Sequence, residues 1–148
     1  DLNNLRPCSR EKINKGDLGM NARTAMSAYT QTKTQSGVES ASSAQLITML
    51  LDGALERVAR ARGHMERGEL AEQGEVIGKV IDIVASLDAY LDHDKGADAS
   101  KTLESLYDYL VRQLYQANMK RDVAILDEVA TLLSEVRAGW VESVKQTG

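Results

Sequence analysis

The side chains best suited to nucleophilic or proton-transfer chemistry near neutral pH are few: one cysteine, Cys8, and two histidines, His64 and His93. Cys8 has no histidine close to it in the sequence, so it lacks the base that would activate a thiol. Asp92 and Asp94 flank His93, an arrangement that could hold a metal ion weakly but is more often a solvated turn. The glycines follow neither GxGxxG nor P-loop spacing. The sequence therefore predicts no catalytic residue, no metal site and no cofactor.

Residues 64–68 read His-Met-Glu-Arg-Gly, which resembles the His-x-x-Lys-Gly signature of histidine-phosphotransfer domains. That family also folds as four-helix bundles, and the resemblance implies a phosphorylated side chain at His64. The family's histidine stands exposed in mid-helix, whereas His64 follows Gly63 where an apolar period ends. The other interpretation is an ordinary helix C-terminus, in which Gly68 and nearby basic side chains have capping roles.

Length and composition favour one globular helical domain. The chain has 148 residues, of which 43% are hydrophobic and 27% charged. A chain of this size can bury about 68% of the surface that its unfolded form exposes, so it needs no disulfide or metal ion to hold a core. The one proline and the one cysteine both precede Met20. From Met20 onward, no proline interrupts a helix.

The charge balance is mildly acidic, with 18 lysines and arginines against 22 aspartates and glutamates. This balance argues against nucleic acid as a partner, because phosphates demand a basic face. No apolar run approaches the ~18 residues of a membrane span, and the start lacks the apolar core of a signal peptide. Together with the lack of cysteine after Cys8, these features predict a cytoplasmic protein without membrane insertion.

Three segments differ in pattern. Residues 1–19 show no helical or strand period and read as a disordered, non-native or upstream leader, with Met20 as the expected initiator. Residues 20–43 are rich in Ser, Thr, Gln and Ala, which predicts an extended N-terminal arm with a short helical turn. Residues 44–148 carry strong helical periods and predict the globular domain.

Four amphipathic stretches fill the third segment, with apolar residues at three- and four-residue steps. The first begins after Ser42 and Ser43, either of which could cap it, and ends between Gly63 and Gly68. Short connections between long helices predict an all-α fold, an antiparallel up-and-down four-helix bundle with an extended N-terminal arm. The other three stretches cover approximately residues 70–91, 103–121 and 123–144.

Two motifs resemble the flagellin export chaperone family FliS. Residues 28–31 read Ala-Tyr-Thr-Gln, which matches the family's Ala-Tyr-x-Gln arm. Residues 46–54 read Leu-Ile-Thr-Met-Leu-Leu-Asp-Gly-Ala, where the family has Leu-Ile-x-Met-Leu-aromatic-Asp-Gly-Ala. Ser43 stands where the family usually has proline, and Leu51 where an aromatic is common. The resemblance covers approximately residues 25–143.

The resemblance implies a cytoplasmic, non-enzymatic chaperone that works without ATP. Its client would be the disordered C-terminal segment of flagellin, which it would keep from premature polymerisation and deliver to the flagellar export gate. Apolar helical segments of a client can lie in grooves between bundle helices. The sequence leaves open whether the free protein is a monomer or a dimer. A histidine-phosphotransfer domain that uses His64 is the alternative function.

Client contacts are expected on the arm and on two helices. Tyr29 either lies over a groove and moves when the client binds, as the resemblance suggests, or staples the arm to the core. Gly53 in mid-helix costs about 1 kcal/mol relative to alanine, which predicts the close approach of another backbone there. Core packing is the competing interpretation for the apolar members of the set. The candidate client contacts are Tyr29, Gln31, Ile47, Leu50, Leu51, Asp52, Gly53, Leu106, Leu110, Leu114 and Asn118.

Overall fold

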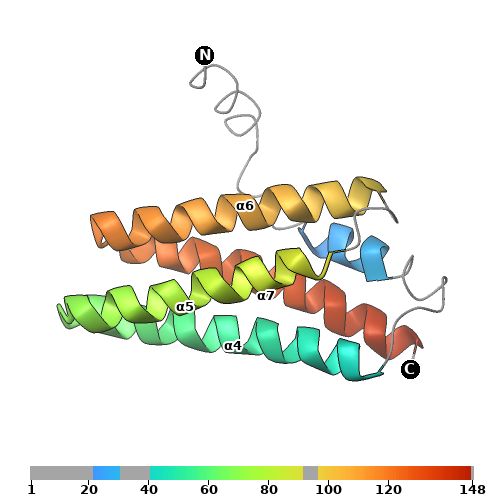
Figure 1. Cartoon of the computed structure of the whole chain (residues 1–148), viewed down its shortest axis with the longest axis horizontal. Helices are drawn as coiled ribbons and strands as arrows, with labels where there is room; N and C mark the ends of the chain where they lie inside the picture. The colour runs from blue at the N-terminus through green and yellow to red at the C-terminus, as the bar shows by residue number, and fades with distance from the viewer. Residues whose placement is uncertain (1–21, 31–40, 92–96, 148) are drawn as a thin grey trace, which may run out of the picture.

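The computed structural model describes residues 22–30, 41–91 and 97–147, and in these ranges the backbone forms five helices and no strand. Figure 1 shows four long helices lying side by side, with a short helix packed beside them. We call the short helix, over residues 22–30, the arm helix. The predicted all-α class is confirmed. The long helices are α4 (Ala41–Glu66), α5 (Leu70–Ala89), α6 (Ala97–Lys120) and α7 (Val123–Thr147).

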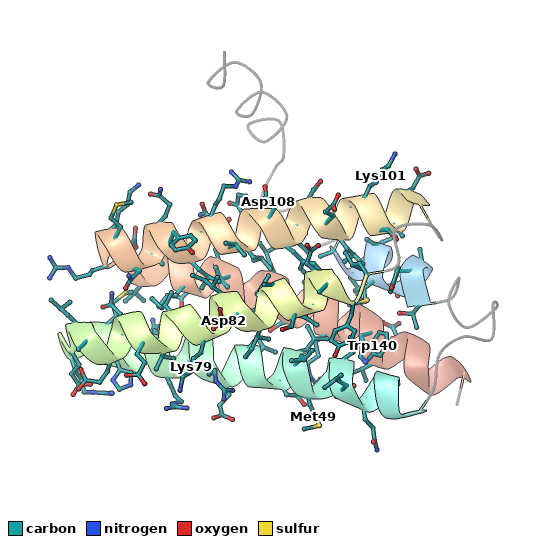
Figure 2. The ribbon with its side chains drawn as sticks, viewed as in Figure 1. Met49, Lys79, Asp82, Lys101, Asp108 and Trp140 are labelled. Atoms are coloured by element: carbon teal, nitrogen blue, oxygen red, sulfur yellow. The ribbon has the colours of Figure 1, made fainter. Side chains whose placement is uncertain are left out.

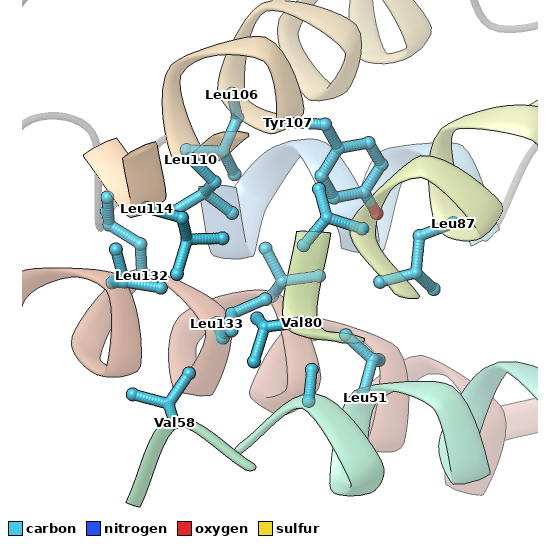
Figure 3. Packing of buried hydrophobic residues seen from close by; sticks show 14 of the residues in the cluster. Leu51, Val58, Val80, Leu87, Leu106, Tyr107, Leu110, Leu114, Leu132 and Leu133 are labelled. Atoms are coloured by element: carbon cyan, nitrogen blue, oxygen red, sulfur yellow. The ribbon is translucent and has the colours of Figure 1, made fainter. Parts of the chain in front are cut away.

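Each long helix packs against two others, because α4 and α6 both contact α5 and α7. This packing is that of a bundle, with the apolar stripe of every helix turned inward. Figure 3 shows leucine and valine side chains from all four helices meeting there, with Tyr107 beside them. Each large apolar side chain that is fully buried contributes about 1.5–3 kcal/mol. Representative core residues are Leu51, Val80, Leu110 and Leu133.

A glycine turn ends α4. Gly68 has a φ of 74°, a left-handed conformation that costs glycine nothing. The Glu69 N–H donates to the His64 carbonyl at 2.9 Å, and the Gly68 N–H donates to the Met65 carbonyl at 3.2 Å. This pair of hydrogen bonds is the Schellman motif that closes a helix C-terminus. The predicted end of the first helix is therefore confirmed, with Gly68 in the capping role.

The connection from α6 to α7 is only two residues long. Arg121 takes the left-handed position after α6, with a φ of 53°. Asp122 then caps α7, since its Oδ1 accepts the Ala124 N–H at 2.9 Å and its carbonyl accepts the Ile125 N–H at 3.2 Å. The end of α6 thus falls where the sequence pattern placed it.

The start of α4 differs from the prediction. The helix begins at Ala41, so Ser42 and Ser43 lie inside it and neither caps it. A proline at position 43 would push the residue before it out of the helical region. Because serine stands there instead, the helix extends toward the N-terminus by more than the sequence pattern indicates.

The arm is also more helical than predicted. Residues 22–30 form one continuous helix rather than an extended segment with a short helical turn. Ala22, Ala25, Met26 and Tyr29 are all buried, and their spacing places them on one helical face. The pattern was present in the sequence, but its two alanines are too small to make an apolar stripe obvious. The described part of the arm is therefore a packed helix.

Several predictions fall outside the described residues. These are the leader over residues 1–19, the initiator Met20, Gln31, and the Asp92–Asp94 segment around His93. Within residues 22–30, 41–91 and 97–147, no helix has the length and apolar character needed to cross a membrane.

Candidate functional site

The arm helix packs on α7 at a glycine. A Cβ built on Gly139 would overlap the carbonyl oxygen of Arg23 and would lie 3.2 Å from the Cβ of Met26. Glycine is therefore required at this position for the arm backbone to approach α7 so closely. The approach buries Met26 and Tyr29 against the bundle. The arm helix thus covers an apolar surface made by the bundle itself.

Polar contacts to the bundle help to hold the arm helix in place, among them an ion pair and two hydrogen bonds. The Arg23 guanidinium pairs with the Glu142 carboxylate at 2.7 Å on the exposed side. The Ser27 hydroxyl donates to the Gly139 carbonyl at 3.4 Å. The Tyr29 hydroxyl donates to the Tyr90 carbonyl, just beyond the end of α5, at 3.3 Å. An exposed ion pair and two long hydrogen bonds contribute little stability, so burial of apolar side chains provides most of the attachment.

Two side chains tie α4 to α7 near the arm helix. The Trp140 indole N–H donates to the Thr48 hydroxyl at 2.8 Å, and Trp140 is only 2% exposed. One turn away, Arg137 forms an ion pair with Asp52. Figure 2 shows Trp140 near α4. Because Trp140 adjoins Gly139 and is the one tryptophan of the chain, its fluorescence would report on the arm helix.

The structure places the predicted residues of the arm and α4 in different environments. Tyr29 is buried under the arm helix, and Leu51 is fully buried in the core. Ile47 and Leu50 are half-buried and pack against the core from its edge. Asp52 is on the surface and is held by Arg137. In this conformation Ile47 and Leu50 keep accessible apolar surface, which Leu51 does not.

No backbone of another described element makes the close approach expected at Gly53. A Cβ on Gly53 would meet the end of the Arg57 guanidinium at 3.1 Å and the Ile83 Cδ1 at 3.8 Å, and no backbone atom of another element is as close. The Arg57 Nη1 donates to the Gly53 carbonyl at 3.2 Å. The close approach occurs instead at Gly139. Sequence spacing could not distinguish the two glycines, because both stand inside a helix and only the fold reveals which one faces the arm.

The predicted wall on α6 lies in the core. Leu106, Leu110 and Leu114 are buried among the other helices. Asn118 is half-buried, and its Oδ1 accepts a hydrogen bond from the Gln73 Nε2 at 2.8 Å. The Gln73 contact ties the start of α5 to the end of α6, and no local sequence pattern predicts it. These four α6 residues shape the bundle in this conformation and present no open groove.

A hollow does lie between α5 and α6. Its apolar floor includes Val84, Tyr107 and Val111. Burial raises the pKa of the Tyr107 phenol, so this side chain is a neutral part of the floor. The ionisable rim of this hollow is acidic, with Asp88, Glu104 and Asp108.

His64 lies in the last turn of α4, where the glycine turn begins. Its Nδ1 is 2.7 Å from the Glu69 carboxylate, which also accepts a hydrogen bond from Arg67 at 2.9 Å. The hydrogen bonds from His64 and Arg67 hold the pKa of Glu69 below its ordinary value. His64 therefore serves the end of the helix, and the capping interpretation accounts for its contacts. Across the described ranges, no group of three or more His, Cys, Asp or Glu side chains could hold a metal ion.

Replacing His64 by glutamine is expected to leave the protein folded. Neither the variant nor the wild type is expected to accept phosphate. Incubation of both proteins with a phosphorylated response regulator should give no labelled chain, because His64 is engaged by Glu69 at a helix end. Labelling of wild type that is lost in His64→Gln would contradict this expectation and revive the phosphotransfer interpretation.

Comparisons with known proteins agree with the motifs of the arm and α4. The family model for flagellar protein FliS matches residues 25–147. The chain belongs to the FliS family. It is 42% identical over 121 residues to the flagellar secretion chaperone FliSB of Pseudomonas aeruginosa, covering 82% of this chain and 96% of that relative. It is 41% identical over 122 residues to the flagellar secretion chaperone FliS of Salmonella typhimurium, covering 82% and 90%.

A further FliS relative, from Escherichia coli, is 36% identical over 126 residues, covering 84% of this chain and 93% of the relative. The predicted resemblance is therefore confirmed over nearly all of the bundle and the arm helix. FliS is a family of chaperones, so the predicted absence of enzymatic activity agrees with the family to which the chain belongs.

Proposed function

We propose that this protein is a flagellar secretion chaperone whose client is the C-terminal segment of flagellin. The observation that carries the proposal is the FliS family match, which spans residues 25–147. Binding would keep the client segment from polymerising in the cytoplasm until the complex reaches a component of the flagellar export gate. A chaperone needs no catalytic residue for this, and binding and release supply the whole activity.

We infer that the client segment takes the place of the arm helix. The arm helix covers an apolar bundle surface with Met26 and Tyr29, and weak polar contacts hold its exposed side. An amphipathic client helix could present the same kind of apolar face to that surface. Ordering a disordered segment costs about 2–5 kcal/mol of the gross interaction energy, which keeps the complex releasable. Tyr29, with Gln31 next along the chain, would therefore move on binding.

The remaining candidate contacts take graded roles in this proposal. Ile47 and Leu50 offer accessible apolar surface on α4, and Asp52 and Gly53 follow in the next turn, facing α7 and α5 respectively. Leu51, Leu106, Leu110 and Leu114 would act from beneath, by fixing the shape of the surface. Asn118 would do so by holding α5 through Gln73. The hollow between α5 and α6 is a second place for an apolar client segment.

Two finer points belong to the same proposal. The four long helices alternate in direction as an antiparallel up-and-down bundle, which is supported by connections of three residues between α4 and α5, seven between α5 and α6, and two between α6 and α7. Residues 41–147 form the bundle domain, and the arm precedes it as a separate displaceable unit. The proposal holds for a free monomer or a free dimer, since the arm surface is complete within one chain.

The direct test uses a peptide that copies the C-terminal segment of flagellin. Titration calorimetry should show one peptide bound to each chain, and circular dichroism should show more helix in the mixture than in the separate components. A peptide of the same composition in scrambled order is the control. Absence of binding by the flagellin peptide, with the protein folded, would discard the proposed function.

Gly53→Leu is expected to weaken the binding of the flagellin peptide while leaving the bundle folded. The added side chain meets only the movable end of Arg57 and the edge of Ile83, so the core need not shift. It would protrude on the α5 side of α4, next to Ile83 and one turn from Leu50, where the client is proposed to reach. Calorimetry should give a Kd raised by about tenfold, or ~1.4 kcal/mol. A cooperative loss of helix in the variant would instead place Gly53 in the core, and an unchanged Kd would remove this part of α4 from the site.

A further inference from the structure

Two large apolar side chains protrude from the outer face of α6. Tyr115 is 58% exposed and Met119 is 69% exposed, and they stand four residues apart on one face of the helix. The core does not need them, because Leu110 and Leu114 already fill the inner face. Aromatic residues and methionine are enriched where proteins meet partners. An adjacent exposed pair of this kind therefore indicates an interaction surface rather than a packing requirement.

A shallow hollow between α6 and α7 adjoins this pair. Two of its lining side chains are cationic and none is a carboxylate, although the chain as a whole carries a net charge of −4. The hollow therefore has the opposite charge to the α5–α6 hollow on the other flank of α6. The lining side chains are Arg112, Gln113, Tyr115, Gln116, Lys120 and Ile125.

Asp108 pairs with Arg112 at 3.4 Å, and two other carboxylates close along the chain are committed to neutral hydrogen-bond donors or to a helix cap. Glu128 accepts hydrogen bonds from the Tyr109 hydroxyl at 2.8 Å and from the Gln113 amide at 3.0 Å. Asp122 caps the first turn of α7. Among the described residues, Lys120 has no carboxylate partner within ion-pair distance. A cation at a helix C-terminus also complements the helix dipole, but that role does not explain the exposed pair beside it.

This surface is remote from the arm helix. Ile125 lies at the start of α7 and precedes Gly139 by about four turns, or about 20 Å along the helix. A client segment over the arm surface would therefore leave the α6 surface uncovered.

We propose that Tyr115, Met119, Lys120 and Arg112, the α6 patch, form a second docking surface that binds an acidic amphipathic helix of a partner protein. The apolar face of that helix covers Tyr115 and Met119, and one of its carboxylates pairs with Lys120, while Arg112, which already pairs with Asp108 at 3.4 Å, lines the adjoining hollow. Charge complementarity selects this occupant over a basic segment. The partner helix and the flagellin segment can then bind at the same time. That one point rests on the proposed function, and the rest of the proposal does not.

The probe is a fluorescein-labelled helical peptide of leucine and glutamate, compared with a peptide in which lysine replaces every glutamate. Fluorescence anisotropy should show that the acidic peptide binds the full chain and the basic peptide does not. The double variant Tyr115→Ser/Met119→Ser should weaken the acidic peptide by about tenfold or more. Lys120→Glu should weaken it and reduce the salt dependence of binding. Met49→Ser should change nothing, because Met49 is as exposed as Met119 but lies on α4, pointing away from the bundle (Figure 2).

Four results would overturn the α6 patch as a partner site. One is equal binding of both peptides, and a second is an equal loss of binding in Met49→Ser. Another is sedimentation that shows a wild-type dimer dissociating in Tyr115→Ser/Met119→Ser, which would give the surface to a second copy of the chain. The last is displacement of the acidic peptide by the flagellin peptide, which would merge the two sites. If the flagellin peptide fails to bind at all, the proposed function fails while the anisotropy result still decides the patch.

Discussion

Replacing Gly139 by leucine is expected to release the arm helix from α7 while the four long helices stay folded. The new side chain would overlap the Arg23 carbonyl, which cannot move unless the whole arm helix moves. Release exposes Met26 and Tyr29, each worth about 1.5–3 kcal/mol of burial, so the free energy of unfolding should fall by about 3–6 kcal/mol. Chemical denaturation measures this loss. Trp140 emission should shift to longer wavelength, because the residue beside Gly139 gains water.

Met26→Ser, which weakens the arm helix from its own side and leaves the bundle surface unchanged, should bind the flagellin peptide more tightly. If the arm helix and the client compete for one surface, the free protein is competent only in the fraction of molecules with the arm released. Met26→Ser raises that fraction, so the apparent Kd should fall. Gly78→Ala is the matched control, since no atom lies within 4 Å of a Cβ there and alanine favours the helix. An unchanged free energy of unfolding in Gly139→Leu would show that the arm helix is not held as described.

Leu110→Ala is expected to lower the free energy of unfolding by about 2–5 kcal/mol, because a fully buried leucine leaves a cavity that the bundle cannot fill completely. Calorimetric or urea unfolding measures the loss. Leu70→Ala should cost far less, since Leu70 is 51% exposed at the start of α5. A variant with unchanged stability that no longer binds the flagellin peptide would reverse the assignment and make Leu110 a direct client contact.

The bundle was predictable because its signal is local and repeated. Each long helix carries an apolar residue every three or four positions, as Leu103, Leu106, Leu110 and Leu114 do on α6, and no proline interrupts the run. The signal for the turn at Gly68 was equally local, since a glycine after an apolar period is a common helix C-terminal cap.

The arm and its surface were less predictable because their signal is divided between distant segments. Gly139 matters only when Arg23 lies against it, and nothing in the sequence near either residue announces the contact. Gly53 also lies inside a helix, but no backbone of another described element packs against it. For a related reason, the sequence could not show which candidate leucines lie in the core and which lie on the surface. A wide apolar stripe has the same sequence pattern in either case. Leu51 and Leu50 are adjacent in the chain, yet only Leu50 retains exposed surface.

Hydrogen exchange of the arm helix tests the central claim most directly. Amide exchange over residues 22–30 would be followed by mass spectrometry in the free protein and with saturating flagellin C-terminal peptide. The proposed displacement predicts that these amides lose protection on binding, while the amides of α4 and α7 around Thr48 and Trp140 keep or gain it. Unchanged or increased protection over residues 22–30 in a fully bound sample would contradict the account, because the client would then bind without moving the arm.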